Sequence, residues 1–235
     1  MPLCPSWTPC PYIKTSWLHL LDHLPHFSVF VGGHIAAFEI DDKRCLPITG
    51  AFIDTSDVVK RFSGDSLRLS LLKIARAAKC PDLSGDRYRS YCAAIFLTNP
   101  SKGRVYNLLP EVVDEYLKTP TEDLGELDDA HISYAIEDML STRCFCLTAG
   151  DRFAWVPDDS TYCVNSHDGS LGDDTWKRTE PGNKICVFEG GSLPYVLRQR
   201  ADGAYTLIGE CWIQGLMHGE ALDLPGFKTE TFVIV

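Results

Sequence analysis

The chain has 235 residues, with 22 basic and 32 acidic side chains, and its formal net charge at pH 7 is −10. This length is enough to bury a hydrophobic core in one compact domain or in two small ones. Because an acidic surface repels phosphate backbones, we do not expect nucleic acid as a partner. No apolar stretch reaches the roughly 18 residues that a membrane-spanning helix needs, so a membrane is not an expected partner either.

The N-terminal sequence MPLCPSWTPCPYIKTSW lacks the basic start and the unbroken apolar run of a secretory signal. We therefore expect a cytoplasmic protein that is not secreted, in which most of the ten cysteines are reduced thiols. Several cysteines lie in apolar or strand-like runs, where a thiol behaves as a small buried hydrophobe: Cys92, Cys144, Cys146, Cys186 and Cys211. The CxC pair has no second cysteine pair to complete a zinc site, and no metal or cofactor is predicted.

Residues 1–26 are punctuated by prolines and are predicted to be irregular, with a short helix over 16–24 that ends before Pro25. A second segment, 27–142, begins with two β-favouring runs, HIAAFEI and RCLPITGAFI. The residues Asp41-Asp42-Lys43 join these runs, so the pattern predicts a β-hairpin.

The hairpin is followed by a region whose apolar residues recur at helical spacing, which predicts three amphipathic helices. Their apolar positions are Leu67, Leu71, Ile74 and Ala78; then Leu109, Val112, Val113, Tyr116 and Leu117; then Ile132, Ala135, Ile136, Met139 and Leu140. Between the last two helices, TPTEDLGELDDAH is acidic and rich in turn residues, which is typical of a solvated loop.

The third segment, 143–235, has the character of short strands. The β-favouring runs are RCFCLT, RFAWV, KICVFEGG, LPYVLRQR, AYTLIGECWIQ and GFKTETFVIV, and a long polar loop over 158–182 separates the second from the third. A tight hairpin turn is predicted at Asp202-Gly203. Because so many short strands would expose many edges in an open sheet, a small antiparallel β-barrel or sandwich is expected. The predicted fold class is α+β, with a helical segment of three or more amphipathic helices before this barrel.

The stretch LIGECWIQGLMHGEAL, residues 207–222, raises the question of a catalytic or phosphate-binding loop. Strand alternation places Tyr205, Leu207, Gly209, Cys211 and Ile213 on a core face, and Thr206, Ile208, Glu210, Trp212 and Gln214 on the other face. Gly209 is then expected at a bulge or a close contact, and Gly215 and Gly219 at the turn that follows. Neither dinucleotide nor P-loop spacing is met, and no catalytic residue is assigned.

Residues 185–222 closely resemble the C-terminal segment of fungal heterokaryon incompatibility (HET domain) proteins. The first part of the resemblance is carried by Pro194, Val196, Leu197 and Arg198, and the second part by Gly209, Glu210, Gly215, Met217, Gly219 and Glu220. Upstream, RCFCLTAGDRFAWVP is similar to the preceding strand pair of the family. The run CLPITGAFIDTSDVVKRF is similar to its G-x-x-x-D-T element. The N-terminal signature domain of that family, with its LSYxWG-like motif, has no counterpart in this chain.

The resemblance implies a non-enzymatic accessory or regulatory module of non-self recognition and programmed cell death, whose partner is a protein or an effector domain on another chain. The candidate binding residues at the barrel rim are Arg198, Glu210, Trp212, His218 and Glu220, and the structural motif residues are Pro194, Gly209, Gly215 and Gly219. For Trp212, packing beneath the helices is an equal alternative. A different function stays open, that of a thiol- and histidine-dependent hydrolase using Cys211 or Cys163 with His218 or His167.

Overall fold

A computed structural model describes residues 45–61, 67–95, 110–119, 143–158, 178–191, 193–217 and 219–235. Its helices are α2 (Leu67–Ala77), α3 (Gly85–Ile95), α4 (Pro110–Lys118) and the short 3-10 helix η4 (Glu220–Asp223). Its strands are β1 (Leu46–Lys60), β2 (Arg143–Thr148), β3 (Phe153–Pro157), β4 (Lys184–Phe188), β5 (Pro194–Gln199), β6 (Tyr205–Glu210), β7 (Trp212–Ile213) and β8 (Glu230–Ile234). The predicted helix over 16–24, the run HIAAFEI and the predicted helix at Ile132–Leu140 lie outside the described residues.

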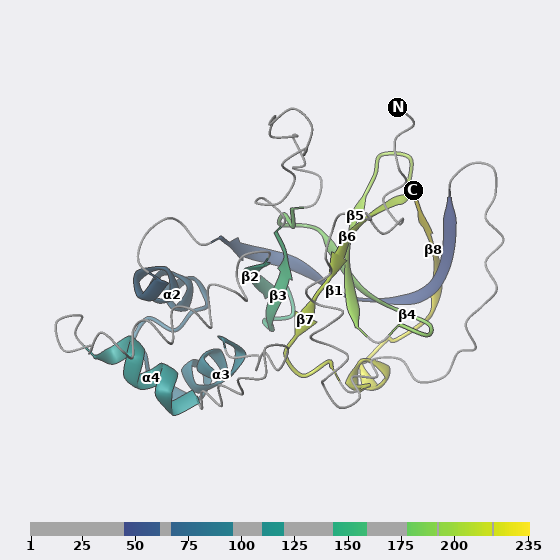
Figure 1. Ribbon diagram of the computed structural model, residues 1–235. Helices are drawn as coiled ribbons and strands as arrows, with labels where there is room; N and C mark the ends of the chain where they lie inside the picture. Colours follow the sequence, from purple (N-terminus) through teal and green to yellow (C-terminus); the bar gives the residue numbers. More distant parts are fainter. Residues whose placement is uncertain are drawn as a thin grey trace, which may run out of the picture.

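The strands form one sheet in the order β4-β5-β6-β8-β1-β2-β3-β7, and β4 also pairs with β1. This extra pairing joins the two ends of the run from β4 to β1, so β4, β5, β6, β8 and β1 close into a barrel (Figure 1). All its pairs are antiparallel except β6 and β8, which meet in parallel at Tyr205 and Ile234. The predicted meander β4-β5-β6 and the α+β fold class with a C-terminal barrel are confirmed.

The long strand β1 holds the sheet together, although it precedes the helices in the sequence. Its first part pairs with β8, its middle with β4 and its last part with β2. In the run RCLPITGAFI, predicted as one arm of a hairpin, the residues from Leu46 onward therefore form the first half of a 15-residue strand. The buried Asp54 helps to fix its course: its carboxylate accepts hydrogen bonds from the Gly150 backbone N–H at 3.0 Å and from Arg152 Nη1 at 3.2 Å.

Strands β2, β3 and β7 extend the sheet beyond the barrel, and β2 and β3 are buried on both faces. Phe145 and Leu147 of β2 pack into a core with the helices, whereas Cys144 and Cys146 pack into a second core with the barrel strands. The helices lie beside β2 and β3 on the side away from β8 (Figure 1). One direct link between them is the hydrogen bond from the Trp155 indole Nε1 to the Ala94 carbonyl at 2.6 Å.

Two of the predicted helices lie within the described residues, and both are present as α2 and α4. Their buried side chains include those expected from the periodicity: Leu71 and Ile74 in α2, Ala78 directly after it, and Val113, Tyr116 and Leu117 in α4. Helix α3, which packs with them in one core, was not predicted. In the described part of the chain, no helix combines the length and the apolar character that crossing a membrane requires.

The barrel interior is filled by side chains from all five barrel strands. They are Leu46, Ile48, Cys186, Phe188, Tyr195, Leu197, Tyr205, Leu207, Phe232 and Ile234. The predicted faces of β6 are partly wrong, because the pairing with β5 shifts by one residue between Leu207 and Gly209. Ile208 is the extra residue of this bulge, and the alternation of faces changes there. Ile208 is buried in the same core as Cys211 and Ile213, while Tyr205 and Leu207 face the barrel interior.

Candidate functional site

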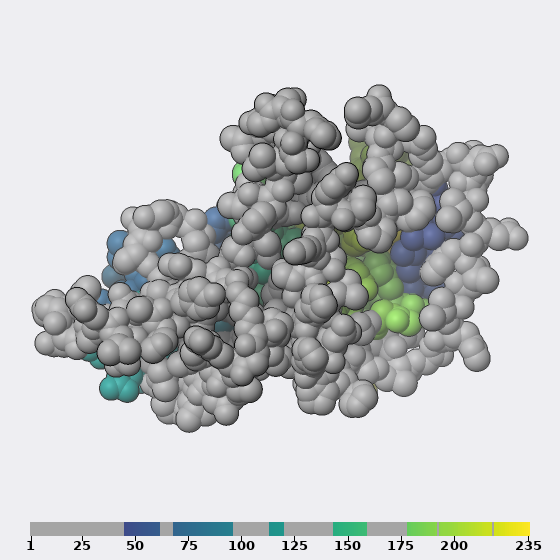
Figure 2. Space-filling model, in the orientation of Figure 1, coloured from purple at the N-terminus to yellow at the C-terminus, as the bar shows by residue number. Residues whose placement is uncertain are grey.

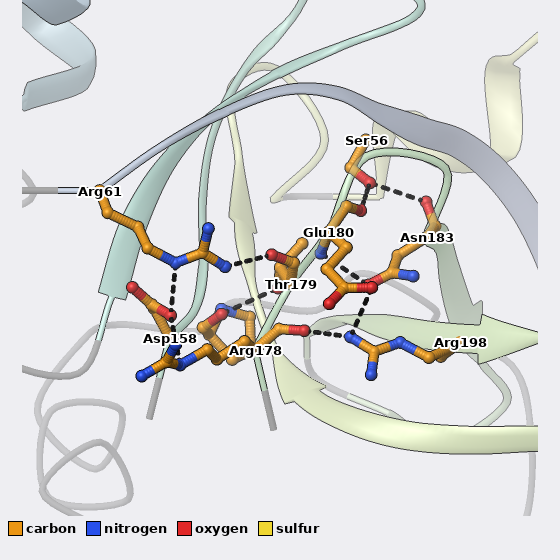
Figure 3. Close-up of polar contacts among 9 residues, drawn as sticks. Ser56, Arg61, Asp158, Arg178, Thr179, Glu180, Asn183 and Arg198 are labelled. Atoms are coloured by element: carbon orange, nitrogen blue, oxygen red, sulfur yellow. Dashed lines mark hydrogen bonds and ion pairs between the residues drawn. The ribbon is translucent and has the colours of Figure 1, made fainter. Parts of the chain in front are cut away.

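Arg198 lies on β5 and links this strand to the segment that precedes β4. Its guanidinium lies 3.5 Å from a carboxylate oxygen of Glu180, and its Nη2 also donates a hydrogen bond to the backbone carbonyl of Arg178. Figure 3 shows Arg198 reaching toward these two residues. The side chain is partly buried and holds neighbouring backbone, which is a structural use of the guanidinium.

Arg198 belongs to a larger set of polar contacts that the sequence did not predict. We call it the loop-base cluster because it joins the two ends of the segment 159–177; its members are Ser56, Arg61, Asp158, Arg178, Thr179, Glu180, Asn183 and Arg198 (Figure 3). Asp158 and Arg178 form an isolated β-bridge across these ends. The sequence signal for this cluster is the pair of opposite charges, Asp158 and Arg178, at the two ends of one polar stretch.

The buried carboxylate of Asp158 is the electrostatic centre of one half of this cluster. Arg61 Nε donates to it at 3.0 Å, and the guanidinium of Arg178 lies 3.9 Å away. Arg61 also donates from Nη2 to the Thr179 carbonyl at 2.7 Å, and the Thr179 hydroxyl donates to the Pro157 carbonyl at 2.8 Å. A buried carboxylate needs such paired donors to stay charged.

The other half of the cluster is made by neutral groups. The Ser56 hydroxyl of β1 lies within hydrogen-bonding distance of the Glu180 carbonyl, at 2.6 Å, and of the Asn183 carbonyl, at 3.2 Å. The Asn183 amide oxygen accepts from the Glu180 backbone N–H at 2.9 Å. Strand β1 is thereby fastened to the turn that leads into β4.

Glu210, the last residue of β6, pairs with Tyr195 of β5, whereas Arg198 pairs with Thr206 at the other end of the same ladder. Burial raises the pKa of the Glu210 carboxyl, and the charge of Arg143 opposes this shift. Arg143 also donates a hydrogen bond to the Glu210 backbone carbonyl. The surroundings of Glu210 are therefore those of a partly buried strand end.

Trp212 pairs with Trp155 across the β3–β7 ladder. Its side chain packs against both large cores, the one with the helices and the one with the barrel strands. This position matches the packing alternative for Trp212. Glu220 begins η4, directly after Gly219 with a φ of 98°, and His218 lies outside the described residues.

The structural motif residues lie at the start of β5, at the bulge of β6 and in the turns that follow β7. The Pro194 carbonyl accepts a hydrogen bond from the Cys211 backbone N–H at 2.9 Å, and Gly209 lies at the β6 bulge with a φ of 152°. Gly215 has a φ of 75° in the turn after β7, where glycine adopts a left-handed conformation at little cost. The predicted rim residues thus lie at several places and do not form one cluster in the described structure.

Cys211, the proposed nucleophile of the alternative function, is buried in the core with Ile208 and Ile213. Burial raises its thiol pKa well above the ordinary value, with Arg143 acting in the opposite direction. A reactive thiol needs a lowered pKa and access to solvent, so the surroundings of Cys211 disfavour this role. Cys163 and His167 lie outside the described residues.

Residues 159–234 match the family model described as the Het-6 beta-barrel domain. Heterokaryon incompatibility protein 6, OR allele, from Neurospora crassa is 43% identical over 59 residues, which cover 24% of this chain and 8% of that protein. No solved structure matches this chain. The matched residues include the barrel strands β4, β5, β6 and β8, to which β1 adds the fifth strand from outside the match. The C-terminal region of this chain is therefore related to the Het-6 beta-barrel region of heterokaryon incompatibility proteins.

Proposed function

We propose that this chain is a non-enzymatic recognition or regulatory module of heterokaryon incompatibility. It acts in non-self recognition and the associated programmed cell death by binding a protein partner or an effector domain on another chain. The similarity to heterokaryon incompatibility protein 6 supports the biological process, and the following observation supports the absence of catalysis.

The residues that carry the family resemblance occupy structural positions in the barrel. Val196 and Leu197 are buried, Gly209 permits the β6 bulge, and the Met217 sulfur accepts a hydrogen bond from the Ile213 backbone N–H at 3.4 Å. Motif residues that serve shape and backbone geometry support a scaffold that displays a surface, because a catalytic motif brings reactive side chains together.

The proposal is tested by expressing the chain in Neurospora crassa strains with different incompatibility alleles and fusing them with strains that lack it. We expect the viability of the heterokaryon to fall in at least one allelic combination. Unchanged viability in every combination would contradict the role in incompatibility.

Two cysteine variants separate recognition from thiol catalysis in the same assay. Cys163→Ala and Cys211→Ala remove the two cysteines of the hydrolase alternative, and we expect both proteins to lower viability as the unaltered chain does. Loss of the effect in either variant, with its expression level and far-UV circular dichroism unchanged, would favour the hydrolase and overturn the proposal.

A further inference from the structure

One end of the barrel interior carries an ammonium group held between two aromatic rings. Lys184 is the first residue of β4 and shares a face with Cys186 and Phe188, which fill the interior. Its Nζ lies 5.4 Å from the ring centroid of Phe52 and 5.6 Å from that of Tyr205. It also donates to the Tyr205 hydroxyl oxygen at 3.4 Å. We call these three side chains the Lys184 surface.

The Lys184 surface is anchored to the barrel core and is partly open to solvent, since Lys184 and Tyr205 are half-buried and Phe52 is exposed. Tyr205 packs edge-on against the interior ring of Phe232, with 5.4 Å between centroids, which fixes the position of its hydroxyl group. Phe52 is 43% exposed, the second largest value among the exposed large hydrophobic side chains of the described residues. On the face shown in Figure 2, purple atoms of β1 lie beside green atoms of the later barrel strands.

The ammonium of Lys184 is not paired directly with a carboxylate of the described residues, although Glu230 of β8 lies near enough to act electrostatically on the same neighbour, Cys186. Among the residues that the structure describes, Lys184 forms no ion pair, whereas Arg61, Arg152 and Arg198 each have a carboxylate partner. An ammonium carries three N–H donors, and one of them is directed to Tyr205. The remaining donors lie beside an exposed apolar ring, in a chain whose net charge is −10.

We propose that the Lys184 surface binds a peptide segment of a partner protein in which a carboxylate lies next to an aromatic or aliphatic side chain. The carboxylate pairs with the Lys184 ammonium and accepts from the Tyr205 hydroxyl, while the apolar side chain covers the ring of Phe52. Aromatic side chains at the centre of an interface supply much of the binding energy. This inference rests on the recognition function proposed above and names its surface and the chemistry of its partner.

Charge complementarity favours a peptide over a nucleic acid as the occupant. A nucleic acid would bring many phosphates against a strongly acidic protein, and the repulsion would outweigh one lysine. A short acidic peptide brings one or two charges, which the Lys184 ammonium and the Tyr205 hydroxyl can satisfy locally.

The test is a selection from a random peptide library displayed on phage, with the purified full chain as the target. We expect enrichment of peptides with Asp or Glu next to an apolar residue. The Kd of a labelled enriched peptide, measured by fluorescence polarisation, should rise about tenfold or more in Phe52→Ala and in Lys184→Met. Lys184→Met keeps a long unbranched side chain and removes its charge.

Matched controls are Leu222→Ala, which removes an apolar side chain of similar exposure, 41%, and Lys228→Met, which removes another exposed lysine charge. Both should bind the peptide as the unaltered chain does. The proposal is overturned if no peptide is enriched, or if the Phe52 and Lys184 variants, shown to be folded by circular dichroism, bind as tightly as the controls.

The binding test and the heterokaryon assay can each contradict one proposal without contradicting the other. If the peptides bind as expected and heterokaryon viability does not depend on the chain, the incompatibility role is wrong and the Lys184 surface stands. If viability depends on the chain and Lys184→Met acts as the unaltered chain does in both assays, the surface is wrong and the role stands.

Discussion

Gly209 of β6 lies directly against the ring of Pro157 in β3, so that a Cβ atom on Gly209 would come within 2.9 Å of Pro157 Cγ. The φ of Gly209 is 152°, a value that residues with a side chain rarely adopt. We therefore expect Gly209→Ala to lower the free energy of unfolding by about 2 kcal/mol, from backbone strain and overpacking together. Urea denaturation with two probes measures this change.

Gly203→Ala is the matched control, because Gly203 also has a positive φ, 85°, but its Cβ would meet open space. It should cost about 1 kcal/mol from the backbone conformation alone. Equal losses in the two variants would show that the contact between β6 and β3 contributes nothing.

A second prediction concerns the carboxylate of Asp54, which accepts from the Gly150 N–H and from Arg152. Asp54→Ala leaves these donors without their partner in a partly buried site, so the free energy of unfolding should fall by about 1 to 3 kcal/mol. Asp57→Ala, three residues along the same strand but exposed, should change it by less than about 0.5 kcal/mol. Similar effects for both would contradict the assigned role of Asp54.

The second half of β1 could not be predicted from local sequence patterns. The run RCLPITGAFI has the apolar residues of a strand, whereas the following DTSDVVK contains polar residues that usually mark a turn or a surface. Asp54 and Ser56 are nevertheless buried, because distant backbone groups of Gly150, Glu180 and Asn183 complete their hydrogen bonds. Partners so far along the chain cannot be deduced from local periodicity.

The helices were predicted only where their apolar residues were strongly hydrophobic. Stripes of mainly leucine, isoleucine and valine predicted α2 and α4, while α3 was missed although Tyr88, Tyr91, Cys92 and Ile95 have helical spacing and are all buried. Tyrosine and cysteine are only moderate helix formers, and the intervening arginines obscured the pattern. The strands after Arg143 were easier, since each apolar run is bounded by turn residues.

The candidate site was less predictable than the barrel. The rim residues were chosen from one stretch of sequence, but the bulge at Ile208 changes which side chains share a face. Lys184 and Phe52 belong to different segments, and only the pairing of β1 with β4 brings them together. The family resemblance identified the barrel motif and carried no information about this contact.

The loop-base cluster gives a third prediction, from the contrast between a buried and an exposed carboxylate. Asp158 is 8% exposed and pairs with Arg61, whereas Glu180 is 56% exposed and pairs with Arg198. Asp158→Asn should lower the free energy of unfolding by about 1 to 2 kcal/mol, because the buried acceptor loses its charge, while solvent partly compensates Arg61, which is 39% exposed. Glu180→Gln should cost less than about 1 kcal/mol, since solvent screens its ion pair. The reverse order would contradict the assigned burial.

A fourth prediction concerns pH and Asp151, at the turn between β2 and β3. Hydrogen bonds from Lys79 first, and then from Arg87, hold the pKa of the Asp151 carboxyl below its ordinary value. Because this pKa is lower in the folded chain than in the unfolded chain, the ion pairs stabilise the fold at pH values above about 4, the unfolded pKa. This stabilisation is lost as the pH falls through the lowered folded pKa.

Asp151→Asn isolates this effect, because asparagine tolerates the positive φ of 65° at this position. The variant should be less stable than the unaltered chain by under about 1 kcal/mol at neutral pH, since the pair is largely solvent-exposed. Urea denaturation across the acidic range should show this difference shrinking below pH 4 or so. A difference that stays constant down to the lowest pH would contradict the role of the ionised carboxylate.

The last prediction concerns thiol reactivity, which bears directly on the hydrolase alternative. Burial raises the pKa of Cys146 to about 12 and that of Cys92 to about 11, so at neutral pH almost none of either thiol is ionised. Because the thiolate is the species that reacts, iodoacetamide should leave Cys92, Cys146 and Cys211 unmodified in the native protein. Mass spectrometry after brief labelling should find all three alkylated only when denaturant is present. Rapid native labelling of Cys211 would restore it as a candidate nucleophile and would contradict its place in the core.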